Sequence, residues 1–176
     1  MRIAYGADET IPATRAVAAW LRAAGHELVV ELVDASWPSV GAGVAEAVAS
    51  GAAEVGVVWC YTGTGVAMAA NKVPGARAAL CVDAATATGA RRWNDANVLA
   101  LSQRLTTDEV AKEIVAAFLA GQPDPAELPV IAELPVMAER ATEAQPGTGA
   151  PPATGDPAAT ADPGTITDAA GADGRG

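Results

Sequence analysis

The chain has 176 residues and a formal net charge of −10, and its hydrophobic residues (51%) include few aromatic ones (4%). This length is enough for one domain, with a core built mainly from Ala, Val and Leu. The acidic balance excludes the basic face that a nucleic-acid partner requires, and it disfavours binding to an anionic membrane surface. No apolar stretch approaches the roughly 20 residues of a membrane span.

The N-terminus runs directly into an apolar strand pattern. It shows no basic region, long apolar region or cleavage site of a signal peptide. Cys60 and Cys81 each end an apolar run, which is typical of reduced thiols rather than of a disulfide scaffold. We therefore expect a cytoplasmic protein.

Strand-like apolar runs alternate with helical segments along the first 120 residues. In chain order, the expected elements are strand 3–5, helix 12–24, strand 28–32, helix 40–50, strand 55–59, helix 65–71, strand 78–82, helix 84–92, strand 98–101 and helix 107–119. Gly25 is a stop signal, and Thr106 or Thr107 is the expected N-cap of the last helix. The alternation predicts an α/β domain over residues 1–121, a three-layer α/β/α sandwich with a five-stranded parallel sheet of Rossmann-like type.

Composition changes near Gly121, since nine of the 12 prolines lie beyond it. Residues 122–144 contain two copies of Ala-Glu-Leu-Pro-Val, and we expect a Pro-interrupted, extended apolar arm rather than a dedicated partner-binding motif. Residues 145–176 are almost wholly Pro, Ala, Gly, Thr and Asp. Such a segment buries too little apolar surface to offset its ordering entropy, so it is expected to be disordered.

Four polar segments follow predicted strands and should meet at the carboxyl edge of the sheet, where open α/β sheets bind ligands. They are Gly6–Glu9, Asp34–Pro38, Cys60–Gly65 and Cys81–Asp83. Cys60 is either a small buried hydrophobe or a nucleophile or base, and its place before a helix start favours the thiolate. The glycine-containing turn after it offers backbone N–H groups to an anion.

Other polar residues leave two interpretations open. Asp8 is either an acid/base or hydrogen-bonding carboxylate or a cap of the first helix. Residues 91–97 should lie near the opposite edge, unless a neighbouring subunit brings them to the site. Their polar run beside Trp93 suits sugar hydroxyls but also a simple turn. We find no metal-ligand cluster, Ser-His-Asp set or full phosphate loop, and no Cys-x-x-Cys pair that would favour a redox protein.

Several motifs occur together in order. They are Cys60-Tyr-Thr-Gly-Thr-Gly65, Ala69-Ala-Asn-Lys-Val-Pro-Gly-Ala-Arg-Ala-Ala-Leu-Cys81, Asn94-Asp-Ala-Asn-Val-Leu-Ala-Leu101, Arg104 and Ala111-Lys-Glu-Ile-Val115. In these motifs the first 120 residues resemble type B ribose-5-phosphate isomerases and the related galactose-6-phosphate isomerase subunits. The resemblance implies a three-layer α/β/α fold and a homodimer or homotetramer with sites between subunits. It also implies that the protein needs no metal and no organic cofactor.

The resemblance further implies the interconversion of aldose and ketose phosphates through a cis-enediolate. By it, Cys60 is the base that moves a proton between C1 and C2, and Thr62 bonds the reacting oxygens. Backbone N–H groups around Gly63, Thr64 and Gly65 stabilise the enediolate oxygen. Asp8 and Asn94 orient sugar hydroxyls.

The chain departs from the family pattern at several substrate-binding positions. Glu9 stands where the family usually has a histidine after Asp, and Trp93 stands where it has the histidine assigned to opening the furanose ring. Trp37-Pro38 replaces a Tyr-Pro pair. The Arg- and His-containing phosphate segment is replaced by Gly121-Gln-Pro-Asp-Pro125.

These departures leave Arg104 as the best anion contact, with Arg91 and Arg92 as weaker candidates, and they leave Trp37 and Trp93 to stack on a sugar. The sequence thus predicts an isomerase of a small sugar phosphate of the ribose-5-phosphate type. The alternative is a diverged homologue that acts on another open-chain or non-phosphorylated sugar, or that only binds a sugar or a partner.

Overall fold

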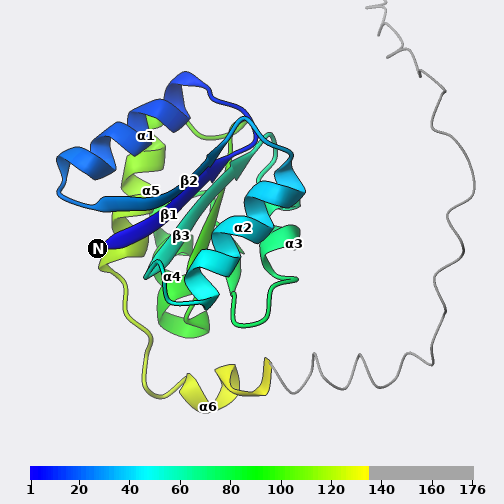
Figure 1. Ribbon diagram of the computed structural model, residues 1–176. Coiled ribbons are helices and arrows are strands. Elements are labelled where there is room, and N and C mark those ends of the chain that lie inside the picture. The colour runs from blue at the N-terminus through cyan, green and yellow to red at the C-terminus, as the bar shows by residue number, and fades with distance from the viewer. Residues whose placement is uncertain (135–176) are drawn as a thin grey trace, which may run out of the picture. The chain divides into compact units, whose positions relative to one another are not determined.

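The structure is a computed structural model that describes residues 1–134. Five strands alternate with five longer helices, and a sixth, short helix follows (Figure 1). Their bounds are β1 Arg2–Ala7, α1 Pro12–Ala23, β2 Glu27–Val33, α2 Trp37–Ala49, β3 Val55–Cys60, α3 Thr64–Ala70, β4 Ala78–Leu80, α4 Ala84–Asn94, β5 Val98–Ser102, α5 Asp108–Ala120 and α6 Leu128–Ile131.

All five strands are parallel and lie in the order β2-β1-β3-β5-β4. The three central strands are buried from end to end, apart from Arg2 at the start of β1. Their continuous apolar character agrees with this position, because a parallel strand that is covered on both faces has no polar side. The sequence-based prediction of a five-stranded parallel sheet is confirmed.

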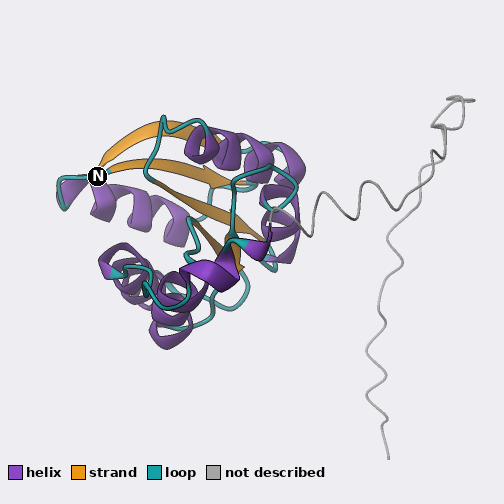
Figure 2. Cartoon of the chain, turned by 90° about the horizontal axis from the view of Figure 1, so that it is seen from below, coloured by secondary structure: helices purple, strands orange, loops and turns teal. Residues whose placement is uncertain are grey.

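Helices cover both faces of the sheet, which gives three layers (Figure 2). On one face, α1, α4 and α5 pack against a core that contains the largest buried side chains, Tyr5, Trp59 and Phe118. On the other face, α2 and α3 pack with small residues such as Val44 and Val66. The small residues allow α2 to approach the sheet closely, since a Cβ on Gly6 would lie 2.6 Å from Val40 Cγ1.

Most element boundaries differ from the expected ones by one or two residues, and two of the differences have a clear local context. Helix α2 begins at Trp37, three residues before the expected start, because Pro38 occupies the first turn, where its missing N–H is not needed. Strand β4 ends at Leu80, two residues early, although the Cys81 N–H still donates to the Ala100 carbonyl at 3.1 Å. The N-cap of α5 is Thr107, which is one of the two residues expected in that position.

The expectation of an extended arm is wrong over Leu128–Ile131, which forms a single helical turn, α6. Pro129 was interpreted as an interruption, but it lies in the first turn of α6, where proline is tolerated. Before α6, Asp124 joins the arm to α4 by accepting from Arg92, with Nη2 3.2 Å from its Oδ2. Residues 135–176, including the tail expected to be disordered, lie outside the described residues.

Candidate active site

Strands β1 and β3 are neighbours in the sheet, so the loops that follow them lie side by side and lead to opposite faces of the sheet. After β1 the chain turns to α1 on one face, and after β3 it turns to α3 on the other face. Such a switch point at the carboxyl edge of a parallel sheet is where α/β proteins bind ligands. Asp8 follows the register pair Ala7–Trp59, and Cys60 is the next residue of β3. The two residues singled out from the sequence therefore meet at this point.

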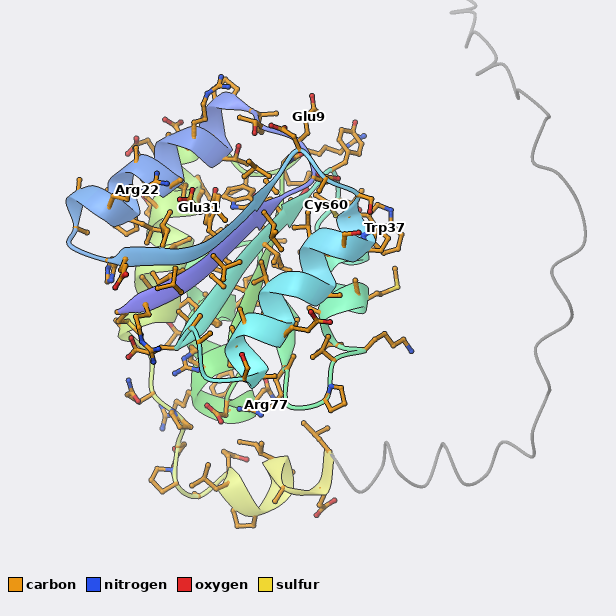
Figure 3. All side chains as sticks on the ribbon, in the orientation of Figure 1. Glu9, Arg22, Glu31, Trp37, Cys60 and Arg77 are labelled. Atoms are coloured by element: carbon orange, nitrogen blue, oxygen red, sulfur yellow. The ribbon has the colours of Figure 1, made fainter. Side chains whose placement is uncertain are left out.

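Cys60 is the last residue of β3 and is only 5% exposed. Its carbonyl accepts from the N–H of Gly63 at 3.2 Å and from the N–H of Gln103 at 3.0 Å. The first bond closes the turn toward α3, and the second ties the turn to the end of β5. Cys60 thus lies in a fixed backbone frame beside the first turn of a helix. Figure 3 shows it at the same end of the sheet as Glu9 and Trp37.

Two glycines of this turn pack closely against neighbouring elements. Gly63 is the N-cap of α3 and has a φ of +77°, and a Cβ there would lie 2.5 Å from Leu80 Cδ1. Gly65 has ordinary backbone angles, but a Cβ there would lie 3.0 Å from the ring atom Cδ2 of Trp37. The turn therefore packs closely against β4 and α2. A side chain at Gly63 would meet the β5 backbone, whereas one at Gly65 would meet only the half-exposed Trp37 ring.

Two hydroxyl groups lie on the exposed side of the turn. Oγ1 of Thr62 and Oγ1 of Thr64 are 2.7 Å apart, and either can be the donor. Both residues are exposed, and Thr64 is the first residue of α3. The first N–H groups of a helix have no partner within it. The predicted contacts at Thr62, Thr64 and Gly65 therefore lie together on one turn.

Asp8 does not cap α1, because the N-cap of that helix is Ile11. Its N–H donates to the Trp59 carbonyl at 3.2 Å, which continues the β1–β3 ladder. Its Oδ1 is buried and has no hydrogen-bond partner within residues 1–134. Glu9 is exposed, and its backbone carbonyl accepts from the Gln103 side chain at 2.9 Å.

Arg104 follows β5 and is joined to Tyr61, a residue that the sequence analysis did not single out. Its N–H donates to the Tyr61 carbonyl at 3.0 Å, and its guanidinium carbon is 6.0 Å from the centroid of the Tyr61 ring. Tyr61 is 59% exposed although it adjoins a buried strand. The only feature of the sequence that points to a role for Tyr61 is its position next to Cys60. Arg104 makes no ion pair with any other described residue.

The other two arginine candidates are engaged elsewhere. Arg91 lies over the Phe118 ring at 5.3 Å, and burial lowers its pKa. Arg92 forms the ion pair with Asp124 described above. Neither lies at the end of the sheet that carries Cys60, since both belong to the last turn of α4.

Trp93 and Asn94 end α4, before β5 begins, and so lie at the opposite edge from Cys60. Trp93 is 56% exposed and its ring packs over Gly89 one turn earlier. Asp95 is the C-cap in the left-handed region, with a φ of +44°, and its Oδ2 is 2.6 Å from Arg77 Nη2. Its role is therefore structural. Within one subunit, Trp93 and Asn94 do not join the Cys60 site.

A cavity of about 860 Å³ opens at that opposite edge. It is bounded by the loop 71–79, by residues 94–96 and by Ile131, Ala132 and Leu134. Figure 3 labels Arg77, a lining residue, at the far end of the sheet from Cys60. This cavity is thus separate from the candidate active site of the same subunit.

Cys81 is fully buried in the core, and burial raises the pKa of its thiol to about 11. It is therefore a structural hydrophobe rather than a second reactive thiol. The side chains of residues 1–134 form no group of three His, Cys, Asp or Glu that could hold a metal ion. Over the same residues, no helix has both the length and the apolar character to cross a membrane.

Comparison with known proteins agrees with this geometry. A family model described as Ribose/Galactose Isomerase matches residues 3–127. The galactose-6-phosphate isomerase subunit LacB of Clostridium acetobutylicum is 36% identical over 132 residues, which cover 72% of this chain and 76% of that protein. The D-erythrulose-4-phosphate isomerase of Pectobacterium atrosepticum is 43% identical over 83 residues, which cover 47% of this chain and 55% of that protein.

A solved structure gives the same result for the fold. The ribose-5-phosphate isomerase B of Clostridium thermocellum matches with a TM-score of 0.73 and 32% identity, over 80% of this chain and 99% of that one. Residues 3–127, matched by the family model, include all five strands except Arg2 and also the Cys60 turn. The chain therefore belongs to the ribose/galactose isomerase family of sugar-phosphate isomerases.

Proposed function

We propose that the protein interconverts an aldose phosphate and a ketose phosphate, with Cys60 as the base. The observation that carries this proposal is the position of Cys60, which is nearly buried at the switch point, near the first turn of α3. The neighbouring strand ends at Asp8, whose Oδ1 is buried and has no hydrogen-bond partner within residues 1–134. Cys60 belongs to the apolar cluster on the α2 and α3 side of the sheet, which limits the contact of its thiol with water.

The reaction needs one proton to move between two neighbouring carbons. The Cys60 thiolate takes the proton from C2 of the open-chain aldose, and the electron pair of that bond forms the C1–C2 double bond of a cis-enediolate. The carbonyl oxygen on C1 then carries the negative charge. The hydroxyl proton on the C2 oxygen passes to the C1 oxygen, so the negative charge moves to the C2 oxygen. Return of the proton from the thiol to C1 then breaks the C1–C2 double bond, forms the C2 carbonyl of the ketose and restores the thiolate.

The groups around Cys60 supply the remaining contacts. Backbone N–H groups of Thr64 and Gly65, at the start of α3, are suited to hold the developing oxyanion. The hydroxyl of Thr62 can bond the second reacting oxygen, and the Asp8 carboxylate can accept from a sugar hydroxyl. Arg104, which forms no ion pair within residues 1–134, is the proposed phosphate contact.

Ribose 5-phosphate and ribulose 5-phosphate are the first candidate pair, because a matched structure carries that activity in its name. Trp93 favours a second candidate. A pentose 5-phosphate must open its furanose ring before C2 can react, and Trp93 provides no acid or base for that step. A tetrose 4-phosphate cannot close such a ring because its C4 oxygen is esterified. A relative named D-erythrulose-4-phosphate isomerase supports this candidate.

We further propose that the active form is a homodimer or homotetramer. Trp93 and Asn94 lie at the edge opposite Cys60 within one subunit. A sugar that contacts both Cys60 and Asn94 must therefore take Asn94 from a second copy. A non-catalytic homologue that only binds a sugar or partner is the remaining alternative.

Deuterium exchange tests this function directly. The protein is incubated in deuterated water with ribose 5-phosphate, erythrose 4-phosphate and unphosphorylated ribose, and exchange at C2 is followed by NMR. We expect exchange with at least one phosphate and its fall by about 10²–10⁴-fold in Cys60→Ala, the usual loss on removal of a general base. Cys81→Ala is the control, because the Cys81 side chain packs in the core on the opposite face of the sheet from Cys60.

Two results would decide against parts of the proposal. If Cys60→Ala retains exchange within twofold of the wild type, Cys60 is not the base. If the wild type neither exchanges any sugar at C2 nor forms a ketose from it, the binding-only alternative replaces the isomerase. Comparison of the two phosphates selects between the pentose and the tetrose.

A further inference from the structure

The loop that carries Asp8 is held from both sides by side chains of distant segments. On one side, the Asp34 carboxylate accepts from Thr10 twice, from its N–H at 2.7 Å and from its hydroxyl at 2.9 Å. On the other side, Nε2 of Gln103 donates to the Glu9 carbonyl at 2.9 Å. These contacts involve successive loop residues, so the loop has little freedom to move.

Gln103 is connected to both halves of the candidate active site. It follows β5, and its N–H donates to the carbonyl of Cys60 at 3.0 Å. Since β3 lies between β1 and β5, the Gln103 side chain bridges past the end of the Cys60 strand to reach the β1 loop. One residue thus sets the spacing between the Cys60 turn and the loop of Asp8.

The opposite clamp has a local structural cause. Asp34 directly follows β2 and has a φ of +55°, in the left-handed region, which aspartate tolerates better than most side chains. Both of its carboxylate oxygens bond the same residue, Thr10. The arrangement therefore holds the loop on its β2 side.

The loop holds a group that lacks a partner of its own. Asp8 Oδ1 is buried and accepts no hydrogen bond within residues 1–134, which is costly for a carboxylate oxygen. Rigid neighbours keep such a group from relaxing toward solvent. The oxygen is then available to a hydroxyl donor that enters the switch point.

We propose that Gln103 is a positioning residue that holds the Asp8 carboxylate at a set place relative to Cys60, with Asp34 as the second clamp. This inference rests on the proposed isomerase function, in which Asp8 accepts from a sugar hydroxyl. Gln103 itself touches no substrate. Its bond to Glu9 prearranges the loop before the sugar binds, so that binding requires no ordering step.

A double-mutant cycle tests whether Gln103 acts through Asp8. Gln103→Met removes the donor and keeps the length of the side chain. Gln122→Met, at an exposed site in the arm, is the matched control. We expect Gln103→Met to lower kcat/KM about tenfold in the wild type and less than twofold in Asp8→Ala. Equal factors in the two backgrounds, or no fall in the wild type, would overturn the proposal.

Amide hydrogen exchange provides a readout that does not depend on activity. We expect faster exchange over residues 8–11 in Gln103→Met and in Gln103→Glu, which also lacks the donor, with unchanged exchange in α5. Unchanged exchange over 8–11 in both variants would refute the clamp. If the wild type turns over no sugar, the proposed function fails, while this measurement still decides whether Gln103 holds the loop.

Discussion

Replacement of Gly63 by alanine should destabilise the protein more than any other glycine substitution of the same backbone conformation. The residue has a φ of +77°, which costs an alanine about 1–2 kcal/mol. The new Cβ would also lie 2.5 Å from Leu80 Cδ1 and 3.0 Å from the Leu101 carbonyl oxygen. Leu80 can shift but the β5 backbone cannot, and such overpacking costs about 1–3 kcal/mol more. The expected total is about 2–5 kcal/mol.

Gly51 offers a matched control. It has the same φ of +77°, and a Cβ there meets nothing within 4 Å. Gly51→Ala should therefore cost only the backbone strain of about 1–2 kcal/mol. The free energies of unfolding of both variants are measured by urea denaturation. If the two variants lose the same stability, the packing contacts of Gly63 contribute nothing and the reasoning fails.

Three other predictions concern single residues. Gly65→Ala should cost less than about 1 kcal/mol, because the half-exposed Trp37 ring it meets can swing outward, and a change in tryptophan fluorescence checks this. Burial raises the pKa of Cys81 from 9.0 to about 11. As the pH rises, the unfolded chain therefore loses this proton first, and the free energy of unfolding falls between those values by on the order of 2 kcal/mol. In urea denaturation at several pH values, Cys81→Ala should lack this part of the pH dependence. Asn71→Leu removes two bonds to the Ala78 backbone, of 2.9 and 2.8 Å, and should lower the free energy of unfolding by about 1–2 kcal/mol; an equal loss in Asn94→Leu would contradict this.

The parts of the site that follow from strand ends were predictable from the sequence. Cys60 and Asp8 each come directly after an apolar run, and parallel strands place all such positions at one edge. Trp93 precedes a strand, which predicted its place at the other edge. Local patterns with a fixed direction thus determine which end of the sheet a residue occupies.

The contacts across the sheet were not predictable in this way. The bond between Gln103 and Glu9 joins residues 94 positions apart, and it exists only because β5 lies next to β3. No local pattern of apolar residues specifies that strand order. Tyr61 was missed for a related reason, since exposure depends on which elements cover the turn. The starts of α2 and α6 were not predictable from Pro38 and Pro129, because proline occurs both in the first turn of a helix and where a helix ends.

The arrangement separates the proposed proton transfer from part of substrate recognition. Cys60, Asp8 and the first turn of α3 meet within one subunit, at the carboxyl end of β3. Trp93 lies before the start of β5, and a strand of five residues spans about 16 Å. That distance is several times a hydrogen bond, so Trp93 can affect a sugar at Cys60 only from a second copy. In the proposed dimer or tetramer, a substitution at Trp93 should therefore change the ratio of kcat/KM for ribose 5-phosphate and erythrose 4-phosphate while leaving the Cys60 chemistry intact.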